Sequence, residues 1–203
     1  MKESVFEKVV DAIDIETVFL CSTEAEGKSL SLRLIKELGF KEGDIISLDC
    51  GVVKNNFFGD AAISVAVGEL SDEVKKLMKI TEESLYMGIE HAVLDNRVHD
   101  ISFAVQQHVE SNGFSVIRDL CGHGVGKKLH EEPSVPNFGN RGTGPKLKKG
   151  MTLAIEPMVN LGSYEVKVGY DGWTILASDG LPSAHFEHTV VIADGKPEIL
   201  TVA

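Results

Sequence analysis

Four carboxylates and one histidine lie in parts of the chain where ionised groups are unusual: Asp49, Asp60, His123, Glu156 and Glu187. Each is in or beside an apolar run that is typical of a β-strand. The runs cover residues 45–53, 57–67, 114–120, 151–159 and 184–192. An ionised group inside such a strand is costly to bury unless an opposite charge neutralises it, and a bound cation would do so.

The first two acids flank a predicted hairpin turn. If Lys54 and Asn55 form a two-residue turn, Asp49 stands directly opposite Asp60. Opposed side chains have Cβ atoms about 5 Å apart, and like charges there are destabilising. A metal ion then lies between the carboxylates, or one is protonated, or the register differs; a three-residue turn would put them on opposite faces. Two exposed aspartates near a turn are the commoner arrangement, but the apolar neighbours on both strands argue against it.

His123 lies in the glycine-rich run Gly122-His123-Gly124-Val125-Gly126. Glycines on both sides allow another backbone or a ligand to approach closely, which is unlike the setting of a core histidine. A phosphate-binding loop is disfavoured because no Gly-Lys-Ser/Thr signature follows. A Cys121–His123 nucleophile pair is disfavoured because such near neighbours rarely meet in the required geometry. His130 could reach the same cleft and polarise a carbonyl, or it is an exposed loop histidine.

Glu156 and Glu187 each interrupt an aliphatic strand, and an edge-strand explanation would have to hold twice. Together with the aspartates and His123 they offer hard oxygen donors and one imidazole. This donor set suits Mn, Fe(II), Co or Zn better than a thiolate-seeking ion. Two ions that share bridging carboxylates lie about 3.5–4 Å apart and can activate a water for hydrolysis.

The elements that position these residues can be predicted from the pattern of apolar residues. Helices are expected over residues 2–13, 28–38, 71–93 and 99–112. Ser71 is suited to cap the third helix, and Gly113 follows the end of the fourth. From residue 114 onwards short strands predominate. Residues 132–150, rich in glycine and proline, read as a long surface loop.

Composition narrows the class of protein. The 203 residues suffice for one α/β domain, and the formal net charge of −11 argues against a nucleic-acid or anionic-membrane surface. No apolar run has the length of a transmembrane helix, and the N-terminus has no signal-peptide pattern, so we expect a cytoplasmic protein. Three cysteines without CxxC spacing argue against a disulfide framework or a thiolate zinc site.

Five motifs resemble bacterial, type I methionine aminopeptidase and follow that family's order from about Lys41 to the C-terminus. They are LDCGVVKNNFFGDAA, CGHGVGKKLHEEP, GMTLAIEPMV, DGWT and HFEHTVV. The Glu-His-Thr ending resembles this family more than the prolidase and Xaa-Pro aminopeptidase branch, which usually carries an arginine two residues before that glutamate.

The resemblance implies a pita-bread fold of the α/β (α+β) class, in which helices flank a curved, mainly antiparallel sheet. It also implies two divalent metal ions, Co, Mn, Fe or Zn. Asp49 would hold one ion, His123 and Glu156 the other, and Asp60 and Glu187 would bridge them. Glu156 would accept a proton from the attacking water, and His130 would contact the substrate amide. The substrate pocket would include Leu120, Leu129 and Trp173.

The resemblance stops before the first metal aspartate. Family members carry a histidine there, whereas here no histidine precedes His91. We therefore expect an atypical helical segment over residues 1–40, a catalytic domain over 41–203, and an incomplete N-terminal part of the fold.

The expected function is metal-dependent removal of N-terminal methionine from nascent proteins. The partners would be nascent polypeptide N-termini, with transient ribosome contact, no nucleic acid and no membrane, and the protein would be a monomer. The alternatives are a non-catalytic pita-bread module that binds peptide N-termini and an Xaa-Pro aminopeptidase or prolidase.

Overall fold

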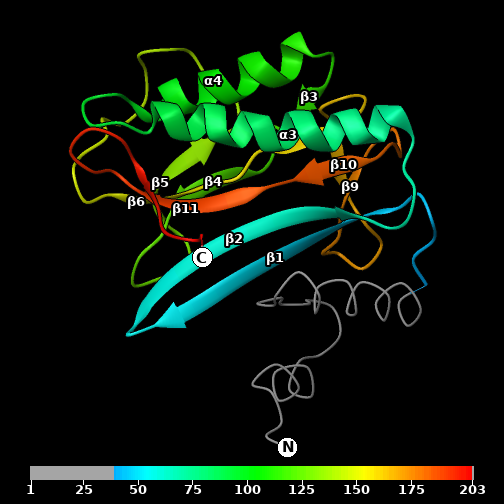
Figure 1. Ribbon diagram of the computed structural model, residues 1–203, viewed down its shortest axis with the longest axis horizontal. Helices are drawn as coiled ribbons and strands as arrows, with labels where there is room; N and C mark the ends of the chain where they lie inside the picture. Colours follow the sequence, from blue (N-terminus) through cyan, green and yellow to red (C-terminus); the bar gives the residue numbers. More distant parts are fainter. Residues whose placement is uncertain (1–38, 203) are drawn as a thin grey trace, which may run out of the picture.

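The structure is a computed structural model that describes residues 39–202 (Figure 1). The helices predicted over residues 2–13 and 28–38 lie outside the described residues, as does nearly all of the predicted segment 1–40. The described part is a mixed α/β structure in which two helices cover one face of curved antiparallel sheets, as the sequence predicted.

The chain first forms a long hairpin of β1 (Ile45–Lys54) and β2 (Phe57–Ala66). Its two-residue turn is Asn55-Asn56, with φ of 54° and 64°. Both positions need positive φ, which asparagine tolerates better than lysine, so the turn predicted at Lys54–Asn55 was wrong by one residue. Asp49 consequently pairs with Ala62, and Asp60 pairs with Gly51. The two aspartates are diagonal neighbours on one face of the hairpin, not directly opposed.

Two helices follow, α3 (Asp72–His91) and α4 (Val98–Ser111). The Ser71 hydroxyl accepts a hydrogen bond from the Val74 N–H at 3.3 Å, which confirms the predicted cap. Gly113, with φ of 91°, follows the end of α4 as expected. Neither described helix combines the length and apolar character needed to cross a membrane.

The main sheet has seven strands in the order β1-β2-β11-β6-β4-β5, with β12 pairing with β11. Its remaining strands are β4 (Cys121–Gly124), β5 (Glu131–Pro136), β6 (Thr152–Ile155), β11 (Glu187–Val191) and β12 (Glu198–Ile199). A second sheet has the order β10-β7-β3, formed by β10 (Ser183–His185), β7 (Met158–Asn160) and β3 (Ser115–Val116). The strand β5 corrects the loop predicted over residues 132–150, whose beginning pairs with β4.

Two predicted strands are each divided between the two sheets. The run 151–159 splits into β6 and β7 at Glu156-Pro157, and the run 184–192 splits into β10 and β11 at Phe186. The breaks lie side by side, since the Phe186 N–H donates to the Pro157 carbonyl at 3.3 Å. Glu156 and Glu187 therefore interrupt apolar strands because they lie where the chain passes from one sheet to the other.

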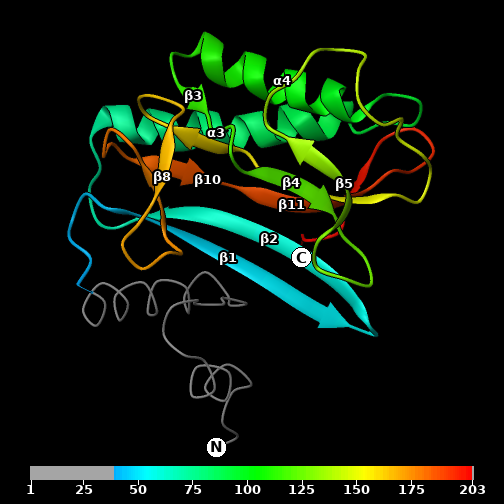
Figure 2. The same cartoon turned by 180° about the vertical axis from the view of Figure 1, so that it is seen from behind.

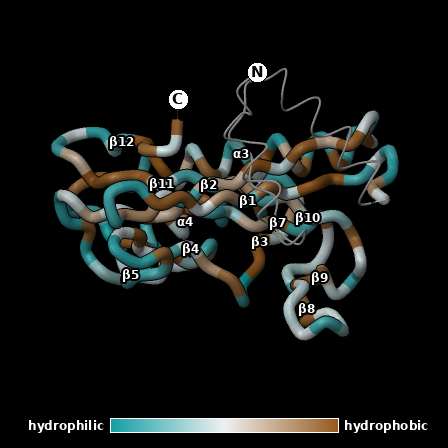
Figure 3. The backbone as a smooth tube through the Cα atoms, turned by 90° about the horizontal axis from the view of Figure 1, so that it is seen from below, coloured by the Kyte–Doolittle hydropathy of each residue, from teal (hydrophilic) through white to brown (hydrophobic). Residues whose placement is uncertain are grey.

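The core lies between the helices and both sheets (Figures 1 and 2). Against the main sheet it contains Leu85, Ile89, Ile101, Leu153, Ile155 and Val190, and against the second sheet Leu77, Ile80, Val105, Val109, Val116 and Val159. A third pair of strands, β8 (Val166–Val168) and β9 (Ile175–Ala177), stands apart from the helices and the main sheet (Figure 3). The helices thus pack against one face of the sheets, and the acids lie on the opposite face.

Candidate metal centre

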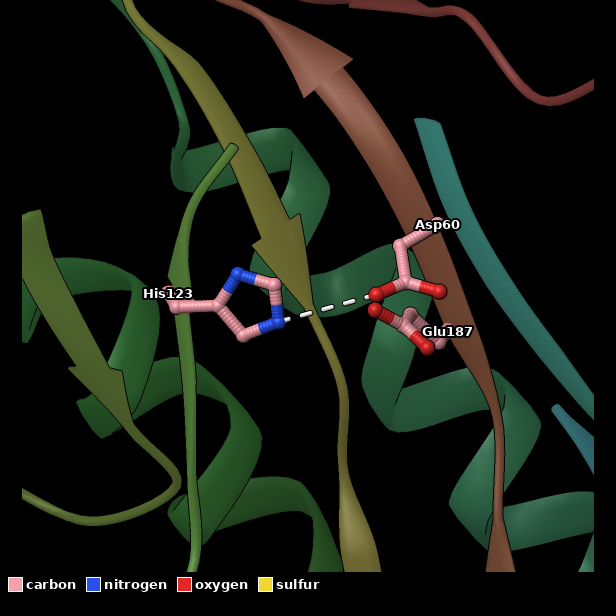
Figure 4. A group of neighbouring side chains, drawn as sticks. All are labelled: Asp60, His123 and Glu187. Atoms are coloured by element: carbon pink, nitrogen blue, oxygen red, sulfur yellow. Dashed lines mark ion pairs between the residues drawn. The ribbon is translucent and has the colours of Figure 1, made fainter. Parts of the chain in front are cut away.

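Asp60 on β2, His123 on β4 and Glu187 on β11 converge, although β4 and β2 are not neighbours in the sheet (Figure 4). One ligand atom from each lies within 4.8 Å of the other two, and all three residues are buried. Curvature of the sheet brings His123 across to the acids. The structure therefore places three of the five predicted ligands in one buried cluster.

Glu156 joins the cluster through His123. The His123 Nε2 atom lies 3.5 Å from Glu156 Oε1 and 3.8 Å from Asp60 Oδ2. These separations are longer than hydrogen bonds of about 2.7–3.2 Å. Two donors bound to one ion at about 2.0–2.2 Å, with angles of about 90–110°, lie about 2.8–3.6 Å apart. The His123–Glu156 spacing thus fits two ligands of a common ion, and the Asp60 spacing is slightly wider.

Asp49 completes the acidic face as the most exposed of the five residues. Partial withdrawal from water raises the pKa of its carboxyl, and the charge of Asp60 and a side-chain hydrogen bond with it raise the pKa further. The diagonal register of the hairpin accounts for this contact, since cross-strand diagonal neighbours remain within reach of each other. Asp49 and Asp60 therefore form the close acid pair that the sequence predicted, in a different register.

The protein supplies little positive charge and few hydrogen-bond donors to neutralise the carboxylates of the two glutamates. Burial, followed by the charges of Asp49 and Asp60, raises the pKa of Glu156 to about 8. Burial, followed by the charge of Glu156, raises the pKa of Glu187 to about 10. In addition, Glu187 Oε1 has no hydrogen-bond partner among the described residues. Orphaned oxygen atoms and mutually repelling carboxylates fit a divalent ion, which would supply the missing positive charge.

The glycines on either side of His123 allow its side chain to point toward the acids. A Cβ atom at Gly122 would lie 2.4 Å from the Ala154 carbonyl oxygen, and one at Gly124 would lie 2.3 Å from that of Glu132. Only glycine allows β4 to lie this close to its neighbours, and the β4–β5 register shifts between these two residues. The His123 Nδ1–H donates to the Gly124 carbonyl at 2.9 Å, which leaves Nε2 free to bind a cation.

Two hydroxyl groups fix the backbone beside the acids. The Thr189 Oγ1 atom accepts from the Asp60 N–H and donates to the Asp60 carbonyl, both at 2.8 Å. The Ser64 Oγ atom makes the same pair of contacts with the backbone of His185, both at 2.9 Å. The intervening β2–β11 ladder is short and consists of Glu187–Ala62 and His188–Ala61. Sequence reasoning missed both hydroxyls, because their partners are distant along the chain.

The residues predicted to contact substrate differ in how close they lie to the metal centre. The His130 ring packs edge-on against His123 with centroids 4.3 Å apart. Leu129 lies beside Gly51, which pairs with Asp60 across the hairpin. A Cβ atom at Gly51 would be 3.3 Å from Leu129 Cδ1. Leu120 is half-buried just before β4. Trp173, in the β8–β9 loop, is 84% exposed and open to solvent, so its pocket role stays a prediction, as do those of the others.

Comparisons with known proteins agree with the motifs. Residues 17–194 match metallopeptidase family M24. The "Methionine aminopeptidase" of Clostridium perfringens is 60% identical over 162 residues, which are 80% of this chain and 65% of that protein. The "Methionine aminopeptidase 1" of Bacillus subtilis is 51% identical over 161 residues, 79% of this chain and 65% of that protein. This chain thus spans just under two thirds of the length of these relatives.

Solved structures give the same result for the fold. The methionine aminopeptidase of Thermotoga maritima superposes with a TM-score of 0.79 and 51% identity, over 81% of this chain and 66% of that one. The prolidase of Pyrococcus furiosus has a TM-score of 0.63 at 22% identity, over 80% of this chain and 42% of that one, and shows the fold alone. The predicted pita-bread fold and the predicted family resemblance are both confirmed.

Proposed function

We propose that this chain, which belongs to metallopeptidase family M24, removes N-terminal methionine from nascent proteins and peptides. The observation that carries the proposal is the buried cluster of Asp60, His123 and Glu187, with ligand atoms within 4.8 Å of one another. Relatives that bear the name methionine aminopeptidase match about four fifths of this chain, 80% in the Clostridium perfringens protein. The match to the family covers residues 17–194, which include all five proposed ligands.

The proposed cofactor is a pair of divalent ions, Co, Mn, Fe or Zn. Asp49 would hold one, His123 and Glu156 would hold the other, and Asp60 and Glu187 would bridge them. When bound, such ions lower the pKa of a water toward neutrality and polarise a carbonyl group. The protein's own part is to hold the carboxylates in place and to exclude other cations from a mostly buried site.

Glu156 is the proposed proton acceptor. Its Oε1 atom is 3.5 Å from His123 Nε2, so its carboxylate lies next to the place where the ions would activate a water. It would take a proton from the attacking water and return it to the leaving amine. His130, exposed beside His123, would donate a hydrogen bond to the scissile carbonyl oxygen as charge develops there. Leu120, Leu129 and Trp173 would contact the methionine side chain.

The assay is methionine release from a Met-Ala-Ser peptide by protein stripped with chelator and reloaded with Mn, Co, Fe or Zn. We expect release with at least one metal and none with chelator. Glu156→Gln should reduce turnover at least 100-fold, because removal of a ligand should cost no less than loss of its supporting groups. Glu198→Gln, at an exposed position on β12, is the matched control and should keep full activity. Folded protein that releases no methionine with any of the four metals would reject the catalytic proposal.

The same assay separates the alternatives. A non-catalytic module would bind the peptide equally with and without chelator and never cleave it. An Xaa-Pro enzyme would prefer a Met-Pro substrate to a Met-Ala substrate. Position 185 supports the methionine aminopeptidase assignment, since it holds histidine where the prolidase branch usually carries arginine.

The proposal includes a setting for the reaction. Nascent chains are the proposed substrate, so we place the protein in the cytoplasm, as a monomer that meets the ribosome only transiently. Sedimentation of the purified protein with and without ribosomes at physiological salt should show a monomer and no stable ribosome complex.

A further inference from the structure

Strands β2 and β11 are joined by only two residue pairs, and their ladder ends at the metal centre. The last pair is His188–Ala61, so the next pair in the same register would be Thr189 and Asp60. In a regular antiparallel ladder the two backbones would stay about 4.8 Å apart and bond to each other directly. The ladder stops instead at Asp60, which carries one of the two proposed bridging carboxylates.

The C-terminal segment binds the backbone groups of Thr189. The Thr189 N–H donates to Thr201 Oγ1 at 3.2 Å, and the Thr189 carbonyl accepts from the Leu200 N–H at 2.8 Å. This segment follows β12, which pairs with β11. The C-terminal residues therefore use the backbone groups that would otherwise pair with β2, and β2 parts from β11 at Asp60.

The side chain of Thr189 lies between the two strands at this point. Its buried Oγ1 atom accepts from the Asp60 N–H and donates to the Asp60 carbonyl, both at 2.8 Å. One hydroxyl thus satisfies both backbone groups that the ladder leaves open. Beyond the other end of the ladder, the Ser64 hydroxyl binds the N–H and the carbonyl of His185 in the same way, both at 2.9 Å. On each side of the ladder a hydroxyl group, not a direct backbone bond, therefore sets the distance between the chains.

Through this contact β11 holds both proposed bridging carboxylates. It carries Glu187 itself, and two residues later its Thr189 hydroxyl holds the backbone of Asp60. The strand is in turn fixed by four residue pairs with β6. Carboxylates that bridge two ions about 3.5–4 Å apart must themselves be correctly spaced. The distance between the strands at Asp60 therefore governs whether both carboxylates can bridge.

We propose that the Thr189 hydroxyl is a positioning group of the metal centre, which sets the separation of the Asp60 and Glu187 carboxylates for a pair of ions. This inference rests on the dinuclear centre of the proposed function. Thr189 acts through the backbone of Asp60 and is not itself a ligand. A methyl group in place of the hydroxyl would leave the Asp60 N–H and carbonyl buried without partners, so the backbone at Asp60 would shift to find new ones.

The test compares two substitutions of Thr189. Thr189→Val removes the hydroxyl with little change of shape, and Thr189→Ser keeps it without the methyl group. Titration calorimetry should show that Thr189→Val weakens Co(II) binding about 10–100-fold, the usual cost of losing a group that supports a metal ligand, while Thr189→Ser stays close to the wild type. The visible absorption bands of bound Co(II), which report ligand geometry, should shift in Thr189→Val and keep their positions in Thr189→Ser.

Thr81→Val is the matched control. Thr81 is also buried, but it lies within α3, where its Oγ1 atom donates to the Leu77 carbonyl at 2.8 Å. This variant should keep the Co(II) affinity and the absorption bands of the wild type, whatever its effect on the urea midpoint. A loss of affinity as large as that of Thr189→Val would assign the effect to general destabilisation and overturn the proposal.

A folded Thr189→Val variant with the Co(II) affinity and absorption bands of the wild type would also overturn it. If Thr189→Val does not fold, Thr189→Ala should show the same loss in both measurements. Failure of both variants to fold would overturn the proposal as well, because Thr189 would then be needed for the fold and not for the centre. Failure of the proposed function looks different, because the wild type could respond to these substitutions as expected and still release no methionine from Met-Ala-Ser.

Discussion

The acids of the metal centre and the acids of the turns have opposite surroundings. In the exposed β8–β9 turn, Asp171 accepts hydrogen bonds from the N–H groups of Trp173 and Thr174, at 3.0 and 2.9 Å. The Thr174 side chain and these amides lower the pKa of Asp171 to about 2. In the centre, burial and neighbouring carboxylates raise the pKa of Glu187 to about 10. In the turn the acid is surrounded by hydrogen-bond donors, whereas in the metal centre each acid is surrounded by other acids.

Asp100 shows that burial alone does not explain this difference. It is buried near the start of α4, where its two oxygens accept from the N–H groups of Arg97 and Gly142, both at 2.8 Å. Burial alone would raise the pKa of Asp100, but these backbone donors outweigh it and the pKa is lowered. A buried acid is therefore satisfied where the fold needs it for structure. Buried acids left without donors mark the place where a cation belongs.

Glu187→Gln should give the largest effect that separates the two groups of acids. We expect it to abolish the stabilisation by Mn or Co and to reduce methionine release at least 100-fold. At pH 7 the metal-free variant should melt at the wild-type temperature, because with a pKa of about 10 the metal-free wild-type carboxyl is already protonated. Calorimetric melting with and without metal measures both effects. A variant that metal stabilises as strongly as the wild type would contradict the ligand role of Glu187.

The stability of the metal-free protein should fall as pH rises. Glu156 and Glu187 have raised pKa values in the folded state, about 8 and about 10, against 4.5 as their ordinary value. The stability that these two groups contribute is therefore complete below about pH 4.5 and is lost as pH rises through their folded pKa values. The loss should be on the order of a few kcal/mol. Saturating metal should oppose this trend, because it binds the deprotonated carboxylates.

Urea unfolding between about pH 5 and pH 9, with chelator and with saturating metal, measures this pH dependence. Stability that rises with pH in chelator would show that the acids are compensated within the protein.

Asp100→Ala should lower stability by about 1–3 kcal/mol, since it leaves two partly buried backbone N–H groups, those of Arg97 and Gly142, without their acceptor. Asp100→Asn should cost less, because its amide oxygen can still accept one of the two hydrogen bonds. Denaturant midpoints give the comparison, and metal binding should be the same in both variants. If Asp100→Ala weakened metal binding as strongly as Glu187→Gln, the separation between structural and metal-binding acids would fail.

Asp171→Ala should give the smallest effect, confined to its own turn. The amides of Trp173 and Thr174 lose their acceptor and should exchange faster with solvent, while the melting temperature of the whole protein stays close to that of the wild type. Amide hydrogen exchange followed by NMR resolves the two sites. A loss of stability as large as that of Asp100→Ala would show that the β8–β9 hairpin contributes to the main core.

Much of the fold and of the candidate metal centre could be predicted from residue types and their spacing in the sequence. The helix from Asp72 has a clear N-cap in Ser71, and both it and the helix from Val98 have apolar faces. The five proposed ligands stand out as ionisable groups in apolar runs. The turn at Asn55-Asn56 could also have been read, from the tolerance of asparagine for positive φ.

The rest depends on partners far along the chain. Pro157 is a local signal for the break at Glu156-Pro157, but neither the break at Phe186 nor the contact between the two breaks has one. The same holds for the hydroxyls of Ser64 and Thr189. The closeness of His185 to Glu156 likewise joins residues that are distant along the chain.

The short ladder between β2 and β11 also bears on how the molecule comes apart. Two residue pairs, two hydroxyl groups and the hydrogen bond from the Phe58 N–H to the Gly126 carbonyl join the hairpin to the rest of the described fold, while the hairpin itself is paired along its whole length. This join is therefore where the native state should open first, with β1 and β2 detaching as a unit before the helices loosen. Asp49 and Asp60 lie on one side of the join and Glu156, Glu187 and His123 on the other, so bound ions would tie the hairpin to the strands that the helices cover.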